Sequence, residues 1–196
     1  MNLPNRLTIG RLILTMIFVA VMSLPIPHKY TISLFIFIVA SVTDFLDGYI
    51  ARARNIVTTF GKLMDPLADK ILTGAVFILL LAEGLVAAWM VVVIMAREFL
   101  VTGLRLVATN RGFVLAADWF GKWKTIFQIA TGIYFLWQLA VVEPALAWAA
   151  DLFEWKPWIY LGQFLIWGTV ILTLYSGLSY LWKNRELLLD EGSSDD

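Results

Sequence analysis

The sequence predicts an all-α integral membrane protein, folded as a single bundle of six transmembrane helices. Hydrophobic residues make up 60% and charged residues 15% of the 196 residues, against roughly 45–50% and about 25% in soluble domains. Mean hydropathy is +0.79. A bilayer core of ~30 Å needs about 20 apolar residues per helix, so six apolar stretches predict six spans. They lie near residues 7–24, 30–50, 63–82, 85–107, 122–142 and 158–182.

The first stretch follows Arg6 and is interrupted by Arg11. A secretory signal has an unbroken apolar region and then a small-residue cleavage site, so we expect a retained first span. The chain contains no cysteine. Disulfides and thiolate metal sites or nucleophiles are therefore excluded.

Four aspartates mark the end of the second stretch and the start of the third: Asp44, Asp47, Asp65 and Asp69. On a helix, the first two project about 60° apart and the last two about 40° apart. Each pair therefore presents two carboxylates to one side. Acidic side chains at membrane depth are costly, so these four predict a functional site. A purely structural polar network is a weak alternative, because carboxylates this close repel one another unless a cation or proton intervenes.

Small residues and one cation extend the same faces. Gly48, Ala51 and Arg52 follow Asp44 by four, seven and eight residues, and Gly61 precedes Asp65 by four. Magnesium binds proteins through one or two carboxylates together with substrate phosphates, and two metals ~3.5–4 Å apart can clamp a phosphoryl centre. The pattern indicates a metal-assisted site for a lipid pyrophosphate. The small residues allow close approach of the head group, and Arg52 can bind a phosphate oxygen.

The fourth and fifth stretches carry further charges. Arg97 and Glu98 lie inside the fourth, and Arg105 is about 80° around the helix and roughly 12 Å along it from Arg97. Lys122 and Lys124 open the fifth. Anchoring at the cytoplasmic surface is an equally good explanation for the lysines and Arg105, but Arg97 is too deep to snorkel. We expect Glu98 to pair with Arg97 or another cation. A cation cluster beside the aspartates implies a second substrate that bears a phosphate.

The last stretch contains Gly162, Gly168 and Gly177, which indicate close helix packing, with an interface between subunits as one form of it. The segment 144–155 before it is expected to lie along the outer membrane interface. Residues 190–196 form a short acidic tail that we expect to be disordered. One catalytic domain is therefore predicted over residues 1–189.

The charge distribution predicts the orientation. Only Lys29 and Lys156 fall in the turns that join spans one to two and five to six. The opposite side carries Arg6, Arg52, Arg54, Lys62, Arg111, Lys122, Lys124, Lys183 and Arg185. By the positive-inside rule both termini and the aspartates face the cytoplasm.

The pattern Asp44-x2-Asp47-Gly48-x2-Ala51-Arg52-x8-Gly61-x3-Asp65-x3-Asp69 resembles the signature of the CDP-alcohol phosphotransferases, and all eight of its fixed positions match. The resemblance implies a six-span membrane enzyme, usually a homodimer and dependent on Mg²⁺ or Mn²⁺. Such an enzyme displaces CMP from a CDP-linked lipid with an alcohol.

The resemblance also implies roles for residues. Asp44, Asp47 and Asp65 would ligate two metal ions, and Asp69 would be the general base and would also touch the second metal. The residues implied for CDP-lipid binding are Gly48, Ala51, Arg52, Thr58, Gly61, Asn5 and Thr8.

A narrower resemblance concerns the acceptor. The segments Asn2–Thr8, Ala96–Arg105 and Gly121–Thr125 resemble the bacterial family members that form phosphatidylglycerophosphate. The implied substrates are CDP-diacylglycerol and sn-glycerol 3-phosphate, the implied location is the cell membrane, and no nucleic-acid partner is expected. The expected ligands of the acceptor phosphate are Arg97, Arg105, Lys122 and Lys124.

Three alternatives stay open at this point. The first is the same chemistry with inositol phosphate, serine or phosphatidylglycerol as acceptor. The second is a divalent-cation transporter, which predicts acids near the bilayer middle on several helices. The third is a non-catalytic lipid-binding scaffold, which has no use for Asp69.

Overall fold

A computed structural model of the chain describes residues 3–54, 59–110, 119–151 and 156–185. Within these ranges, it does not describe the side chains of 3–7, 45–54, 59–66, Asp69, Asn110 and Lys156. The described residues are helical and include no strand, which confirms the predicted all-α class. The helices are α1 (Leu3–Ser23), α2 (Lys29–Arg54), α3 (Thr59–Ala82), α4 (Ala88–Asn110), α5 (Trp119–Ala140), the short 3₁₀ helix η1 (Ala147–Ala149) and α7 (Lys156–Lys183).

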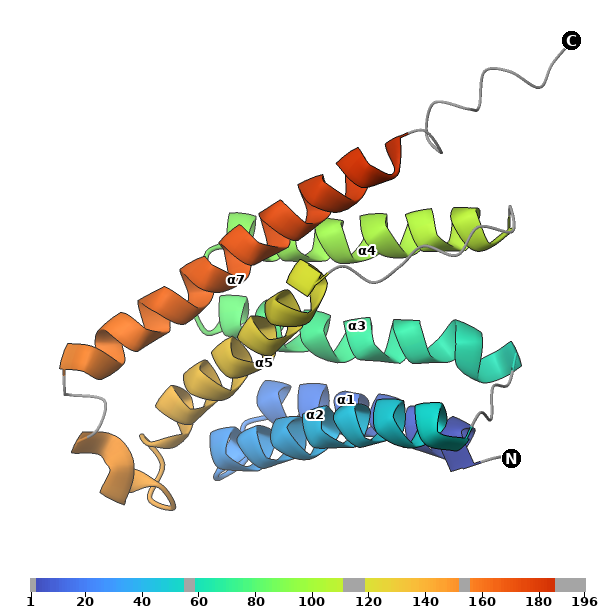
Figure 1. The fold of residues 1–196 in the computed structure, drawn as a ribbon. Coiled ribbons are helices and arrows are strands. Elements are labelled where there is room, and N and C mark those ends of the chain that lie inside the picture. The colour runs from blue at the N-terminus through green and yellow to red at the C-terminus, as the bar shows by residue number, and fades with distance from the viewer. Residues whose placement is uncertain (1–2, 55–58, 111–118, 152–155, 186–196) are drawn as a thin grey trace, which may run out of the picture.

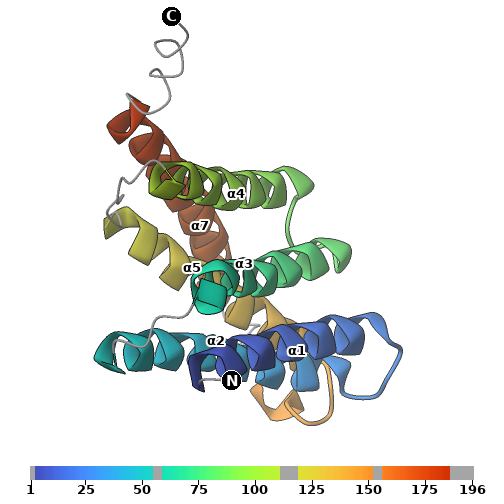
Figure 2. The ribbon, with the colours of Figure 1, turned by 90° about the vertical axis from the view of Figure 1, so that its right-hand side faces the viewer.

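The helices form three levels. Figures 1 and 2 show α1 and α2 side by side at one edge, α3 and α5 in the middle, and α4 and α7 at the other edge. The axes of α1 to α4 are roughly parallel, with successive helices running in opposite directions, and α5 and α7 cross them obliquely (Figure 1). The most extensive packing is between α5 and α7 and between α1 and α2.

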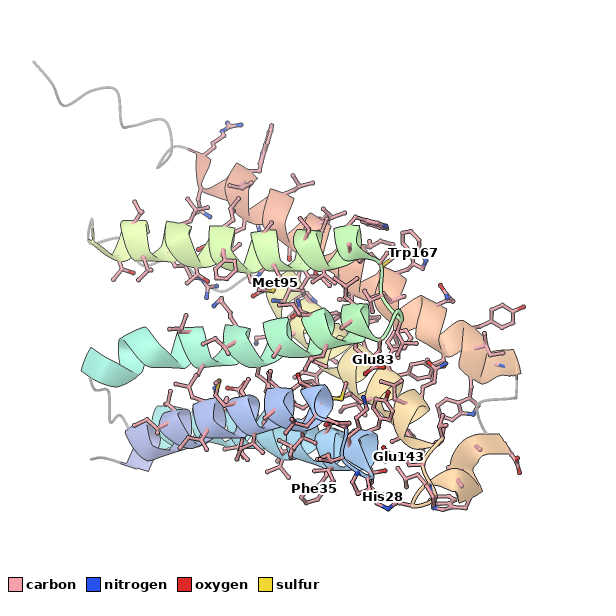
Figure 3. The ribbon with its side chains drawn as sticks, turned by 180° about the vertical axis from the view of Figure 1, so that it is seen from behind. His28, Phe35, Glu83, Met95, Glu143 and Trp167 are labelled. Carbon is pink, nitrogen blue, oxygen red and sulfur yellow. The ribbon has the colours of Figure 1, made fainter. Side chains whose placement is uncertain are left out.

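The core is apolar and draws on several helices. Phe18, Phe37, Phe77, Ile94 and Leu136 are fully buried. Met95 lies between α3 and α4 (Figure 3), where a Cβ at Gly74 would come 2.9 Å from its Cε atom. A side chain at position 74 would therefore displace the end of the Met95 side chain.

The outer surface is also apolar. Phe35, on α2, points away from the bundle (Figure 3) and is 68% exposed. Met16 and Trp182 are exposed to a similar extent. Large apolar side chains spread over a surface this widely favour contact with lipid over contact with water.

One helical segment, Pro157–Lys183 in α7, is long and apolar enough to cross a membrane by length and composition alone. Among the described residues, Thr8–Ser23 and Lys70–Ala82 form shorter apolar helical segments. Each of the six apolar stretches of the sequence overlaps one helix. The number of membrane crossings nevertheless stays a prediction.

The three glycines singled out in the last stretch pack against this same chain. A Cβ at Gly162 would overlap the ring of Tyr134, and one at Gly168 would overlap the ring of Phe127. Between the same helices, the hydroxyls of Thr131 and Thr169 are 2.8 Å apart. The glycines therefore let α7 approach α5 closely.

A distant carboxylate caps the start of α2. Glu143, in the turn after α5, accepts hydrogen bonds at 2.9 Å from the backbone N–H groups of Tyr30 and Thr31. The Thr31 hydroxyl donates to it at 2.6 Å. Burial raises the pKa of Glu143, but the hydrogen bonds from Thr31 and the two backbone groups outweigh burial and hold the pKa below its usual range. The first turn of a helix has unpaired N–H groups, and Glu143 satisfies two of them.

Segment 144–155 contains η1, with Trp148 75% exposed. Its location at a membrane interface stays a prediction. The predicted tail, residues 190–196, lies outside the described residues.

Candidate active site

The backbone brings the two aspartate pairs to the same end of the bundle. Asp44 and Asp47 lie in the last turns of α2, and Asp65 and Asp69 lie in the first turns of α3. Both pairs therefore have the helical spacing expected for them. Figure 1 shows the end of α2, the start of α3 and the N-terminus at one end of the molecule.

Several predicted site residues lack a described side chain. Thr58 lies outside the described residues altogether. The others have helical backbone only: Asn5, Asp47, Gly48, Ala51, Arg52, Gly61, Asp65 and Asp69. Their side-chain roles stay predictions.

Among the four aspartates of the predicted site, Asp44 is the one whose side chain the structure describes. It forms an ion pair with Arg11 of α1. The Arg11 side chain is 3% exposed and that of Asp44 32% exposed. Thr8, predicted to contact the nucleotide, is buried nearly one turn before Arg11. The helix α1 therefore contributes to the aspartate site.

Arg11 was not among the predicted site residues. A cation inside an apolar span is itself a signal for a functional residue, but the sequence argument used Arg11 only to exclude a signal peptide. A buried charge is costly unless it is paired, so Arg11 required an acidic partner. Asp44 is that partner.

The donor chemistry of the four aspartates fits a divalent cation, which takes carboxylate oxygens as ligands. Asp44 is already engaged with a positive charge, so this position accommodates an ionised carboxylate. Among the residues that the structure describes, no group of three acidic or histidine side chains forms a metal site. That statement does not cover Asp47, Asp65 and Asp69, because their side chains are not described.

A second site joins α4 to α5. We call Arg97, Glu98, Lys124 and Gln128 the Glu98 cluster. The Glu98 carboxylate forms an ion pair with Lys124 Nζ and accepts a hydrogen bond from Gln128 at 3.5 Å. Arg97 Nη1 lies 3.5 Å from the same carboxylate oxygen. The pairing of Glu98 with a cation, predicted from the sequence, is confirmed.

The cluster is well shielded. The side chains of Glu98 and Lys124 are 7% and 5% exposed, and that of Arg97 is 13% exposed. Placing charges in such surroundings is tolerated only when they are paired and hydrogen-bonded. One carboxylate faces two cations here, so the cluster carries an excess of positive charge.

The other two predicted acceptor ligands are exposed. Arg105, two turns beyond Arg97 on α4, places its guanidinium 5.7 Å from the ring centre of Tyr180 on α7. Lys122 lies at the start of α5, two residues before Lys124. The structure therefore brings Arg97 and Lys124 together at one carboxylate, and places Arg105 against α7.

Sequence reasoning missed three polar partners of these cations. Gln128 contacts Glu98, Ser176 contacts Arg97, and Tyr180 contacts Arg105. Gln128 is one helical turn after Lys124, which places it on the same face of α5. Ser176 and Tyr180 have no comparable signal, because they belong to an otherwise apolar helix.

A helical bundle with an apolar outer surface, four helix-borne aspartates at one end and a buried cation cluster defines the class of protein. The model of the CDP-alcohol phosphatidyltransferase family matches residues 1–175. The chain belongs to that family, which confirms the resemblance.

Curated relatives are similar over nearly the whole chain. The CDP-diacylglycerol–glycerol-3-phosphate 3-phosphatidyltransferase of Bacillus subtilis is 41% identical over 95% of this chain and 97% of its own length. Enzymes with the same name are 36% identical in Rickettsia bellii, over 91% of this chain and 93% of the relative, and 35% identical in Shigella flexneri, over 97% and 98%.

Proposed function

We propose that this chain transfers the phosphatidyl group of CDP-diacylglycerol to sn-glycerol 3-phosphate, giving phosphatidylglycerophosphate and CMP. The observation that carries the proposal is the near full-length similarity to relatives named for that reaction. The chain is thus a phospholipid-forming transferase. The primary hydroxyl of glycerol 3-phosphate attacks the phosphorus that bears diacylglycerol, the bond from that phosphorus to the CMP oxygen breaks, and the hydroxyl proton leaves to a base.

The aspartates are proposed to serve the donor side of the reaction. Asp44, Asp47, Asp65 and Asp69 would hold two divalent ions, Mg²⁺ or Mn²⁺, which supply positive charge to the pyrophosphate. Asp69 accepts the proton of the attacking hydroxyl. Arg52 contacts a phosphate of the CDP group, and Gly48, Ala51 and Gly61 leave room for it. Asn5, Thr8 and Thr58 complete the proposed CDP-lipid site.

The cations are proposed to serve the acceptor side. Arg97, Arg105, Lys122 and Lys124 set four positive charges against the one carboxylate of Glu98, a balance that suits a dianionic phosphate. Glu98 holds Lys124 and Arg97 at a fixed separation, so they are ordered before the acceptor arrives. Serine lacks the phosphate that this site would bind, so the geometry supports glycerol 3-phosphate over it.

We also propose where the enzyme works. It lies in the cell membrane as a homodimer of six-span subunits, with both termini and the active site facing the cytoplasm. The aspartate-bearing helix ends share one end of the bundle with the N-terminus and the end of α4, which supports a single water-facing site (Figure 1).

An acceptor panel tests the function. Purified full-length protein in detergent is given CDP-diacylglycerol, Mg²⁺ and one radiolabelled acceptor at a time: glycerol 3-phosphate, inositol phosphate, serine or glycerol. We expect labelled lipid with glycerol 3-phosphate. Labelled lipid from inositol phosphate and none from glycerol 3-phosphate would overturn the choice of acceptor. No labelled lipid with any acceptor, together with metal-dependent ion flux in vesicles, would favour the transporter.

A further inference from the structure

Two hydroxyl groups of α7 hold the two arginines of α4. The Nε of Arg97 donates to Ser176 Oγ at 3.1 Å, and the Nε of Arg105 donates to Tyr180 Oη at 3.4 Å. Ser176 is fully buried and Tyr180 is 3% exposed. Each contact joins residues that are more than seventy positions apart in sequence.

The two contacts share one face of each helix. Ser176 and Tyr180 are one turn apart on α7, while Arg97 and Arg105 are two turns apart on α4, and both spacings keep the side chains on one side. Between the hydroxyls, a Cβ at Gly177 would come 3.0 Å from Cγ of Arg97. The surface of α7 is therefore shaped to the stem of Arg97 as well as to its guanidinium.

The hydrogen bonds also fix how the arginines can be used. Ser176 donates its own proton to the backbone carbonyl of Thr173 at 3.1 Å, so its lone pairs are directed to Arg97. A guanidinium bound through Nε keeps its terminal Nη groups for other contacts, and in Arg97 one of them, Nη1, lies 3.5 Å from the Glu98 carboxylate. Both contacts with α7 therefore restrict the flexible part of the arginine side chain without occupying its terminal Nη groups.

Resting on the proposed function, we propose that Ser176 and Tyr180 are positioning residues that aim Arg97 and Arg105 at the phosphate of the acceptor. They make the enzyme specific for a phosphorylated alcohol without touching it. A side chain ordered in advance loses less entropy when the ligand binds. Arginine has several rotatable bonds, so the gain is large for this residue type.

Five variants of the full-length enzyme test the proposal, with the Michaelis constant of each substrate measured separately. The positioning variants are Ser176→Ala, Tyr180→Phe and Tyr180→Leu, and the matched controls on the same helix are Thr169→Val and Tyr175→Phe. Thr169 is a buried hydroxyl that bonds Thr131 instead of a cation. Tyr175 is half exposed and packs on Phe120.

We expect Ser176→Ala to raise KM for glycerol 3-phosphate about tenfold, since hydrogen bonds to charged groups are strong. Tyr180→Phe should raise it about threefold, because its bond is longer and the ring under Arg105 remains. Tyr180→Leu, which also removes the ring, should exceed Tyr180→Phe. KM for CDP-diacylglycerol and kcat should stay within about twofold, and both controls should keep the wild-type KM for glycerol 3-phosphate.

Inorganic phosphate gives a second measurement. It should inhibit the wild type in competition with glycerol 3-phosphate, and its inhibition constant should rise in each positioning variant by about the same factor as KM. Unchanged constants in Ser176→Ala and Tyr180→Phe would overturn the proposal, as would an equal loss of affinity for both substrates. If Ser176→Ala fails to fold, the two Tyr180 variants decide alone. A wild type that ignores glycerol 3-phosphate refutes the proposed function instead.

Discussion

At the scale of single residues, the buried charged side chains that the structure describes lie in ion pairs. Arg11 pairs with Asp44, and Glu98 pairs with Lys124 and Arg97. A low-dielectric setting makes an unpaired charge expensive. Replacing charged residues in the bundle, with turnover and thermal stability measured separately, therefore distinguishes catalytic from structural roles.

Asp69→Asn tests the proposed base. The amide keeps the size of the side chain but cannot take the acceptor proton, so turnover should fall by at least ~10²-fold, while binding of CDP-diacylglycerol is retained. The measurement pairs CMP release with equilibrium binding of the labelled nucleotide lipid. Asp151→Asn, an exposed position at the far end, is the control. Near-normal turnover in Asp69→Asn would remove Asp69 from the mechanism.

Glu98→Gln tests the buried ion pair. It leaves Lys124 without its carboxylate, and breaking a buried pair costs about 3–5 kcal/mol. The thermal midpoint in detergent should fall by roughly 6–20 °C. Adding Lys124→Met removes the orphaned charge and should recover at least half of the loss. A double variant as unstable as the sum of the two single variants would show that Glu98 and Lys124 do not interact.

At the scale of helices, sequence patterns predicted where each helix lies better than how the helices contact one another. The apolar stretches overlap α1 to α5 and α7, because the same run of side chains that satisfies a bilayer also satisfies a helix. The oblique crossing of α7 over α4 could not be predicted. It depends on Gly177 meeting Arg97, a contact that no local pattern encodes.

The capping of α2 by Glu143 was unpredictable for the same reason. The Glu143 carboxylate lies 112 residues from Thr31 in sequence. Local rules look for a capping residue directly before the helix, and there the chain has His28, whose φ is 58°. Only the packing of α5 against α2 brings a carboxylate to this helix start.

The cap makes a pH-dependent contribution to stability. Because the folded pKa of Glu143 lies below its unfolded value, its contribution is full above the unfolded pKa of about 4.3 and is lost as pH falls through the folded pKa. Glu143→Gln should therefore lower the thermal midpoint at pH 7. The difference from wild type should shrink below about pH 4. A difference that stays constant down to pH 3 would contradict the assigned cap, and Asp151→Asn serves as the charge control.

At the scale of the whole molecule, the helical placement of the four aspartates was predictable, and the contacts around them were less so. The four aspartates lie on α2 and α3 near one end of the bundle (Figure 1), with the helical spacing expected for each pair. The contact of Arg11 with Asp44, and those of Ser176 and Tyr180 with Arg97 and Arg105, are tertiary contacts. Uncharged polar residues such as Ser176 and Tyr180 become informative only when their neighbours are known.

The absence of cysteine makes the predicted orientation easy to test. A single cysteine is introduced at exposed positions of opposite ends, as Asp151→Cys or Lys183→Cys, and intact cells are treated with a membrane-impermeant maleimide. The Asp151→Cys variant should react in intact cells, and the Lys183→Cys variant only after lysis, because the basic side of the molecule is predicted to face the cytoplasm. The reverse labelling pattern would show that the basic side faces the outside. Equal labelling of both variants in intact cells would contradict the prediction that the two ends lie on opposite sides of the membrane.

The most direct test of the central claim is to count both products of one reaction. Purified enzyme, CDP-diacylglycerol, Mg²⁺ and labelled glycerol 3-phosphate should yield CMP and labelled phosphatidylglycerophosphate in equal amounts, with no CMP when glycerol 3-phosphate is omitted. Direct attack by the acceptor hydroxyl requires that equality. CMP released without labelled lipid, or at the same rate without the acceptor, would contradict the account.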